Sequence, residues 1–339
     1  MVLHCGVDLH GDNGYYGIVD QSGKRVLGRR LPNDLGEVLG LLEPYRESLR
    51  EGVVVESTFN WYWLADGLRD HGYRVRLANP AAMEQYNGLK NSDDKSDAFF
   101  LAELSRLKIV PEGYIYPQED RPGRDLLRRR MLLVQQRTAH ILSFQSLAAR
   151  ELGGGPTATQ VHGMHPEDVE GFFDDSRLVL MGRTNVEVIR FLTERIHELE
   201  GVALKQVALK AEYVKLLTAP GIGQVLALTI MLETGDVHRF KKAGNYTSYC
   251  RCVKSKRESN GRSKGENNRK NGNRYLCWAY IEAANFMRRY SPEAKAWYQR
   301  KLSRSKRVVA TKALAAKIAK ACYFMMWDQV DFDVKKLFG

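Results

Sequence analysis

The chain has 339 residues, five cysteines and a formal net charge of +12, from 52 Lys and Arg against 40 Asp and Glu. This length allows two domains with sizeable cores, and the positive charge is typical of proteins that bind a polyanion such as nucleic acid. No apolar run is long enough to span a bilayer, and no signal-peptide pattern is present. An odd number of cysteines argues against a disulfide framework, so we expect a cytoplasmic protein without a membrane partner.

The first hundred residues alternate strand and helix patterns. The sequence "GDNG" between the first two strands is a strong hairpin-turn signal. Three meandering strands followed by β/α alternation predict an α/β domain with a mixed sheet. We expect strands over residues 2–10, 15–20, 24–31, 52–58 and 73–79, and helices over residues 34–49 and 61–72.

The stretch "NSDDKSDAFF", residues 91–100, has three aspartates before an apolar helical pattern. Aspartate favours helix starts, so a helix is predicted to begin here. Asp97 would lie one turn after Asp94, although Asp93 stands at an equivalent spacing. The expected core face of this helix consists of Ala98, Leu101, Leu104 and Leu107.

After about residue 110 the strand signals disappear and long amphipathic helices follow. Two of them, over 123–152 and 185–217, flank a turn-rich segment with a short helix near 166–174. This arrangement predicts an antiparallel helical hairpin, either a plain packing unit or a coiled-coil surface for dimerisation. Further helices are predicted on both sides of "PGIG" within 216–236, as in a helix-hairpin-helix that holds a phosphate, and over 276–290 and 310–327.

Residues 251–275 form a basic segment with nine Lys or Arg against two Glu. It has little apolar surface to bury, so we expect a mobile loop that orders on a phosphate backbone. The residues expected to contact nucleic acid are Arg257, Arg262, Lys264, Arg269, Lys270 and Arg274.

Four acids are candidates for a metal site. Asp8 ends the first strand and Glu56 ends a buried strand, at the rim of the sheet where ligand sites form. Asp94 and Asp97 would join them from one helix face if the strands follow a ribonuclease H-like order. Four crowded carboxylates need divalent charge, and two Mg²⁺ ions among them would clamp the attacking and leaving oxygens of a phosphodiester.

Several motifs resemble the transposases of the insertion-sequence 110 family, which are DEDD-type serine recombinases guided by a structured bridge RNA. The segments "GVDLH", "VVVEST" and "DKSDA" are similar to the three segments of the family's RuvC-like domain. The segments "LLTAPGIGQVLALTIMLETGDVHRF" and "KNGNRYLCWAYIEAA" are similar to its C-terminal transposase domain. The resemblance implies a RuvC-like domain over 1–112, a helical or coiled-coil linker over 113–212 and a transposase domain over 213–339.

The resemblance also implies roles for particular residues. Asp8, Glu56, Asp94 and Asp97 fall on the family's metal-binding acids, which implies Mg²⁺ or Mn²⁺ and favours Asp94 over Asp93. Ser259 in "ESNGR" falls in the segment of the nucleophilic serine. The family has Gly directly after that serine, whereas this chain has Asn260 and then Gly261, so Ser263 remains an alternative.

The implied activity is recombination of a mobile element, with donor and target DNA and a guide RNA as partners and a transient serine–DNA bond. The resemblance further implies a homo-oligomer, a dimer or tetramer, whose acids and serine meet within one chain or between chains. A RuvC-like nuclease or junction resolvase that uses activated water would share the acids and needs no serine. An actin-like ATPase should have a second Asp- and Gly-rich phosphate loop, and this sequence contains none. A non-catalytic RNA-binding scaffold would explain the positive charge but not the four acids.

Overall fold

The computed structural model describes residues 1–83, 93–207, 211–253, 256–260, 262–266 and 271–339. Its contacts divide the chain into two compact units, the first mainly Met1–Gln118 and the second Glu119–Glu266 with Gly272–Gly339. Within the described residues, no helix is both long and apolar enough to cross a membrane. The division into 1–112, 113–212 and 213–339 stays a prediction.

The first unit contains a six-stranded mixed sheet in the order β3-β2-β1-β4-β5-β6. The first three strands form the predicted antiparallel meander, and β4 and β5 run parallel to β1. The two-residue strand β6 was not predicted, because so short a segment has no alternating pattern. The strands are β1 Leu3–Leu9, β2 Asn13–Asp20, β3 Arg25–Pro32, β4 Val53–Glu56, β5 Val75–Ala78 and β6 Glu112–Gly113.

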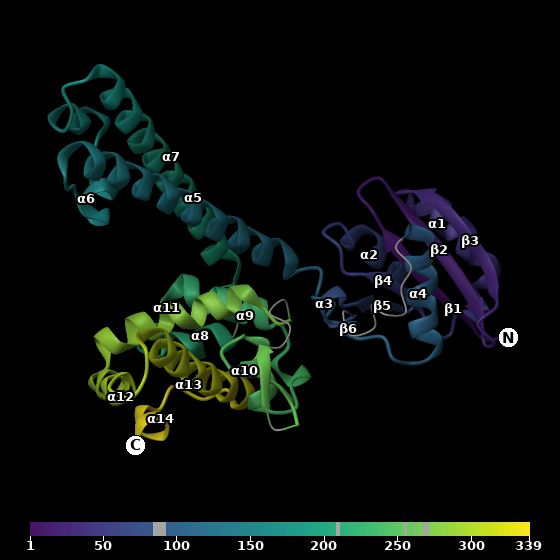
Figure 1. Ribbon diagram of the computed structural model, residues 1–339. Coiled ribbons are helices and arrows are strands. Elements are labelled where there is room, and N and C mark those ends of the chain that lie inside the picture. The colour runs from purple at the N-terminus through teal and green to yellow at the C-terminus, as the bar shows by residue number, and fades with distance from the viewer. Residues whose placement is uncertain (84–92, 208–210, 254–255, 261, 267–270) are drawn as a thin grey trace. The chain divides into compact units, whose positions relative to one another are not determined.

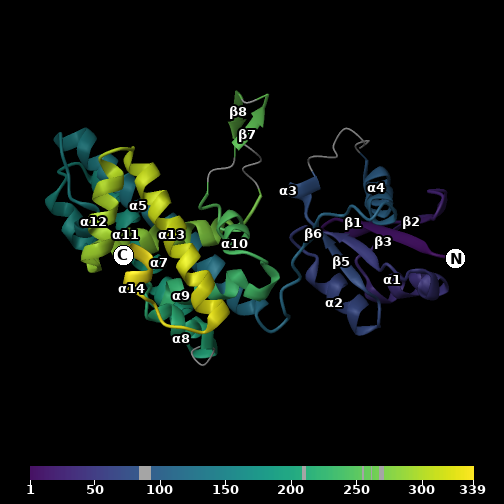
Figure 2. The same ribbon diagram turned by 90° about the horizontal axis from the view of Figure 1, so that it is seen from below.

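Helices cover both faces of this sheet, as Figure 2 shows with α4 on one side and α1 and α2 on the other. The α1/α2 face is apolar, with Cys5, Val7 and Val55 in the same core cluster. Residues at the alternate strand positions, such as Val54, pack under α4. The helices are α1 Leu35–Leu42, η1 Glu43–Ser48, α2 Tyr62–Asp70, α3 Pro80–Met83 and α4 Asp94–Arg106.

A row of glycines lets α4 lie directly on the sheet. Gly6, Gly17 and Gly28 are paired in register across β1, β2 and β3. A Cβ atom on Gly6 would come within 2.3 Å of the Ala98 carbonyl oxygen, and one on Gly28 within 2.9 Å of the Phe99 ring. The missing side chains therefore set the height of α4, and with it the position of the aspartates at its start.

We expect Gly6→Ala to lower the free energy of unfolding by about 3 kcal/mol, the upper end of the cost of overpacking, because the new methyl meets backbone atoms that cannot rotate away. Gly40→Ala is the control, since Gly40 lies in α1 with nothing within 4 Å of a built Cβ. That change should stabilise by up to ~1 kcal/mol through helix propensity. Denaturant unfolding measures both, and a Gly6→Ala protein as stable as wild type would contradict the close packing.

The core face of α4 follows the prediction except at its end. Ala98, Leu101 and Leu104 are buried, but Leu107 is 46% exposed. The helix ends at Arg106, so Leu107 is the C-cap residue and its side chain leaves the buried face. The expectation that Leu107 belongs to the core was wrong, since helical spacing does not indicate where the helix stops.

The second unit begins with the predicted helical hairpin, although its second helix starts at Ser176 and not at residue 185 as predicted. Two 32-residue helices, α5 and α7, run side by side, with α6 at their far end (Figure 1). The far end has its own small core, which includes Phe144, Val169 and Ile189. The elements are α5 Arg121–Leu152, α6 Ala158–Gly163, η3 Pro166–Gly171 and α7 Ser176–Val207.

Helices α8 and α11 pack on α9, in which every residue from Leu226 to Thr234 is buried, and α13 contacts α8, α10, α11 and α12. The predicted turn "PGIG" separates α8 from α9, and Gly221 has φ +88° with a built Cβ only 2.4 Å from the Met287 nitrogen. Only glycine fits there. The helices are α8 Ala211–Leu217, α9 Gln224–Thr234, η4 Val237–Arg239, α10 Ala243–Tyr249, α11 Arg274–Tyr290, α12 Pro292–Leu302, α13 Arg307–Asp328 and α14 Val334–Phe338.

The basic segment is not devoid of secondary structure. Two strands, β7 Lys256–Ser259 and β8 Arg262–Glu266, pair in an antiparallel hairpin. The expectation of a loop here was therefore wrong for the described residues. Asn260-Gly261 is a hairpin-turn dipeptide, but its polar flanks lack the apolar alternation that normally marks strands.

Candidate active site

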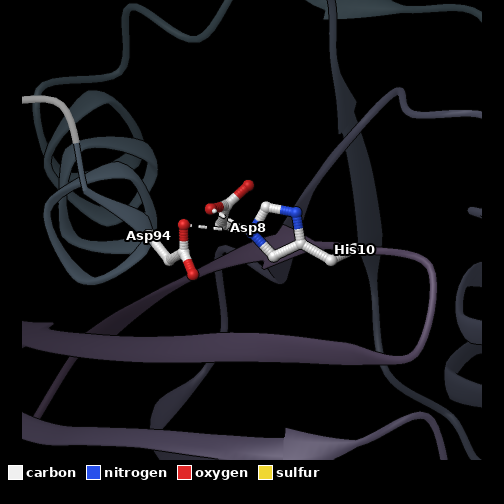
Figure 3. Close-up of side chains that lie close together, drawn as sticks. All are labelled: Asp8, His10 and Asp94. Atoms are coloured by element: carbon white, nitrogen blue, oxygen red, sulfur yellow. Dashed lines mark ion pairs between the residues drawn. The ribbon is translucent and has the colours of Figure 1, made fainter.

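Three side chains meet where strand β1 ends and helix α4 begins (Figure 3). His10 Nε2 lies 3.2 Å from Asp8 Oδ2 and 3.3 Å from Asp94 Oδ1. Potential ligand atoms of Asp8, His10 and Asp94 all lie within 4.8 Å of one another. Asp8 is buried, while His10 and Asp94 are partly exposed, so the cluster is open to solvent on one side.

The local sequence explains why these side chains converge. Side chains alternate along β1, so Asp8 lies on the same face as Gly6, the face covered by α4. Asp93 caps the helix, with its Oδ1 accepting a 2.6 Å hydrogen bond from the Ser96 nitrogen. Asp94 is then the first helical residue, where the positive end of the helix dipole favours a carboxylate.

Arg30 on β3 keeps Asp94 ionised. Its Nη2 donates to Asp94 Oδ2 at 2.5 Å, and its Nη1 donates to Asn13 Oδ1 at 2.6 Å. The hydrogen bond from Arg30, followed by the charge of His10, holds the pKa of Asp94 below its usual value. The negative charge of this carboxylate therefore persists to lower pH than in a free aspartate.

The turn between β1 and β2 is fixed by two asparagines. Asn60 Nδ2 donates to the His10 carbonyl at 2.6 Å, and Asn33 Nδ2 donates to the His10 and Gly11 carbonyls at 3.1 and 3.0 Å. The His10 nitrogen in turn donates to the Asn13 carbonyl at 2.8 Å. These bonds hold the backbone of His10 in place beside the acids.

The other two predicted acids lie outside the three-residue cluster but near it in the fold. Val7 pairs with Val55 in the parallel register, so Asp8 and Glu56 are the next residues on neighbouring strands. Paired positions on parallel strands point to the same face, which is the α4 face for Glu56 as well. Asp97 lies one turn along α4 from Asp94, and its Oδ1 is buried.

His10 was missed by the analysis of the sequence. The available signal was the spacing in "GVDLH", because residues two apart on a strand point to the same face. A histidine two residues after a candidate acid was therefore a candidate partner. Arg30 had no such signal, since its approach to Asp94 depends on the pairing of β3 with β2.

The role of Arg30 predicts a change in titration. A lowered folded-state pKa stabilises the fold above the unfolded value of about 3.9, and this contribution is lost as pH falls through the folded pKa. In the metal-free protein, Arg30→Gln should move the Asp94 midpoint upward toward that ordinary value. Arg29→Gln, an equal charge change on the same strand, should move it much less. Carboxyl carbon NMR measures both, and equal midpoints in wild type and Arg30→Gln would contradict the pairing.

The candidate nucleophile lies in the β7–β8 hairpin. Ser259 pairs with Arg262, Glu258 pairs with Ser263, and Asn260 between them has φ +53°. Ser259 is thus the last strand residue before the turn, and Ser263 lies on the opposite strand. Among the predicted nucleic-acid contacts, Arg262 is exposed, Arg257 and Lys264 are described only in their backbone, and Arg269 and Lys270 lie outside the described residues.

The two ends of this segment are held together by helices α9 and α10. The Asn273 nitrogen donates to the Tyr249 carbonyl at 2.6 Å, which closes the segment between α10 and α11. Asn273 also caps α11 through Oδ1 and donates from Nδ2 to Glu233 Oε2 at 2.7 Å. Next along the chain, Arg274 Nη2 donates to the Tyr275 hydroxyl at 2.8 Å.

Glu233 joins this closure to helix α5. Its carboxylate is 2% exposed and contacts Arg124 at 3.0 Å and Arg128 at 2.5 Å. Burial alone would raise the pKa of Glu233, but the hydrogen bond and charges of the two arginines outweigh it and lower the pKa. Removing one partner of a buried ion pair costs about 3–5 kcal/mol. The ion pairs of Glu233 therefore hold the ends of the basic segment firmly against helices α5 and α9.

The acid cluster has the donor chemistry of a site for a hard divalent cation. Carboxylate oxygens are the preferred ligands of Mg²⁺ and Mn²⁺. Asp8 and Asp94 already face a common point occupied by a ring nitrogen, and Arg30 keeps one of them ionised. The residues present therefore fit a divalent ion.

Two family models match the chain. The first, for DEDD-type transposases of IS110 elements and described as "Transposase", matches residues 5–149. The second, described as "Transposase IS116/IS110/IS902 family", matches residues 214–299. Together they cover more than half of the 339 residues. A comparison with curated proteins found no match.

Proposed function

Because the chain belongs to the IS110 family of transposases and therefore acts on DNA, we propose that it cuts and rejoins the strands of a mobile element. The observation that carries this proposal is the convergence of Asp8 and Asp94 at the end of β1. The strand order β3-β2-β1-β4-β5 supports a ribonuclease H-like, RuvC-like domain around these acids.

Asp8, Glu56, Asp94 and Asp97 would hold Mg²⁺ or Mn²⁺. When bound, the metal supplies positive charge that polarises a phosphodiester and stabilises the charge of its transition state. Asp8 contributes a buried carboxylate from a rigid strand, and Arg30 holds Asp94 in its ionised form. The pairing of β4 with β1 supports Glu56 as a neighbouring ligand, and the helical spacing supports Asp97.

Ser259 is the proposed nucleophile. Its oxygen attacks phosphorus, the P–Oγ bond forms, and the bond to one deoxyribose oxygen breaks, so that this oxygen leaves as a hydroxyl after taking up a proton. The serine proton passes to a base or to water. Because one phosphodiester replaces another, attack by a DNA hydroxyl on the serine–DNA bond rejoins a strand without an energy source. The cations Arg257, Arg262 and Lys264 would offset the charge that develops on phosphate.

Guidance by a structured RNA and assembly into a dimer or tetramer complete the proposal. Both come from the resemblance of the sequence motifs to the insertion-sequence family. The long α5–α7 hairpin supports an assembly role, because exposed apolar residues such as Leu142, Leu180 and Phe191 lie along it. Donor and target DNA would then be chosen by pairing with RNA, so no side chain needs to encode a target sequence.

The proposed function is tested with a plasmid that carries the gene together with its native flanking DNA. Expression of the wild-type chain should produce recombined DNA junctions, which sequencing detects. Deleting a flanking non-coding segment while supplying the protein from a second plasmid should abolish them if that segment encodes the guide. Cleaved but never rejoined DNA would instead support a nuclease that uses water.

A further inference from the structure

A second basic surface lies over helix α12 and its connection to α13. Residues 288–307 contain eight Lys or Arg and one Glu, for a net charge of +7, which equals that of the longer basic segment 251–275. The whole chain carries only +12, so everything outside these two segments is net negative. A positive charge as large as that of the basic segment therefore lies outside the segment that contains the candidate nucleophile.

Most of these cations are exposed and free of carboxylate partners. Within the part of the chain that the structure describes, none of the eight cations from Arg288 to Arg307 forms an ion pair. The one acid, Glu293, is engaged at the start of α12, where the Ser291 hydroxyl donates to its Oε2 at 2.8 Å. The eight are Arg288, Arg289, Lys295, Arg300, Lys301, Arg304, Lys306 and Arg307.

The surface includes a groove of about 340 Å³ between the end of α11 and α12. The Arg288 guanidinium lies 5.1 Å above the Tyr298 ring, which fixes it on the groove wall. Lys295 and Gln299, one turn apart on α12, line the other side. The groove thus offers charged and hydrogen-bonding groups along the helix.

The cations in the last turns of α11 and α12 complement the helix dipole, but those at the start of α13 do not. Lys306 and Arg307 stand at the start of α13, where the helix dipole is already positive and no side chain caps the helix. A bound polyanion would relieve this repulsion.

We propose that this α12 surface, from Arg288 to Arg307, binds the phosphodiester backbone of duplex DNA. Helix α12 has eleven residues and is about 16 Å long, which equals the rise of about five base pairs. Tyr298, the ring that lines the groove, is 3% exposed, and the exposed ring of Tyr290 is already stacked on Phe286, so the groove offers no platform for unpaired bases. Cations without base-reading groups bind duplex DNA independently of sequence.

Binding of duplex DNA by the α12 surface does not depend on the proposed chemistry and requires only that the protein binds DNA. Part of the surface also lies beyond residue 299, where the second family match ends. Its role is to hold DNA that flanks the reacting phosphate. Loss of this surface should weaken binding without altering the acid cluster or Ser259.

The test uses the full chain in EDTA, so that binding is measured without cleavage. The probe is a DNA duplex of arbitrary sequence and about 30 base pairs, long enough to exceed the α12 footprint. The variant carries Lys295→Gln, Arg300→Gln, Arg304→Gln and Arg307→Gln. Each lost phosphate contact should reduce the slope of log affinity against log salt by about 0.9, up to about 3.6 for four contacts.

The matched control removes four positive charges that already have carboxylate partners. These are the ion-paired residues Arg150, Arg177, Arg183 and Arg195, each changed to Gln. The control should retain the wild-type slope, and exchanging Lys and Arg within the α12 surface should retain affinity. Equal effects of the two variants, or an unchanged slope, would overturn the proposal. A loss confined to an RNA hairpin of equal length would overturn it in favour of RNA.

Discussion

Asp8→Asn should lower the rate of DNA strand cleavage by at least about 10³-fold in Mg²⁺. This loss corresponds to about 4 kcal/mol of transition-state stabilisation, within the several kcal/mol that a bound metal supplies. Asparagine keeps the shape of the side chain beside His10 Nε2, but it lacks the charge that a hard cation needs. Cleavage of a labelled substrate under single-turnover conditions gives the rate.

The control for Asp8 is Asp70→Asn, an exposed acid at the end of α2 in the same unit. It should cleave at the wild-type rate, and both variants should retain DNA affinity and the wild-type unfolding midpoint. Mn²⁺ titration followed by the signal of the free ion should show weaker binding for Asp8→Asn alone. A fully active Asp8→Asn protein would remove the acid cluster from the reaction.

Ser259→Ala should abolish both recombination and the protein–DNA adduct while leaving DNA binding intact. The change removes only the hydroxyl. Water cannot replace it, because water cannot form a covalent bond between the protein and DNA. Ser259 lies at the end of β7, next to a turn with Asn260 in a left-handed conformation, so alanine fits the extended backbone without strain.

Ser263→Ala is the matched control on the opposite strand of the hairpin. Ser263 pairs with Glu258, whereas Ser259 pairs with Arg262 at the turn. The Ser263 variant should recombine with at most a moderate loss. If it loses the adduct and Ser259→Ala keeps it, the assignment of the nucleophile moves to Ser263.

Strong local patterns predicted much of the fold. The sequence "GDNG" joins β1 and β2, and apolar runs predict β4 and the long helices α5 and α7. Failures occurred where local pattern and three-dimensional context differ. Leu107 continues the apolar spacing after its helix has ended, and β7 and β8 form a hairpin without apolar alternation.

Part of the candidate site could be predicted from the sequence, because its acids lie near the ends of strands and helices. Asp8 is the second-last residue of a strand and Asp94 starts a helix, and both kinds of boundary are visible in sequence. The sequence does not reveal how closely α4 approaches β1, because this approach depends on three glycines that line up only when the strands pair. The partners His10 and Arg30 join the acids only because of that packing and pairing.

The most direct test of the account is to stop the wild-type reaction with denaturant and map any DNA-linked peptide by mass spectrometry. We predict that adduct forms in Mg²⁺ or Mn²⁺, is absent in EDTA, and is attached to Ser259. Metal dependence and attachment site are then read from one sample. Cleavage with no adduct, or an adduct that forms equally well in EDTA, would contradict a reaction that needs both the acid cluster and the serine.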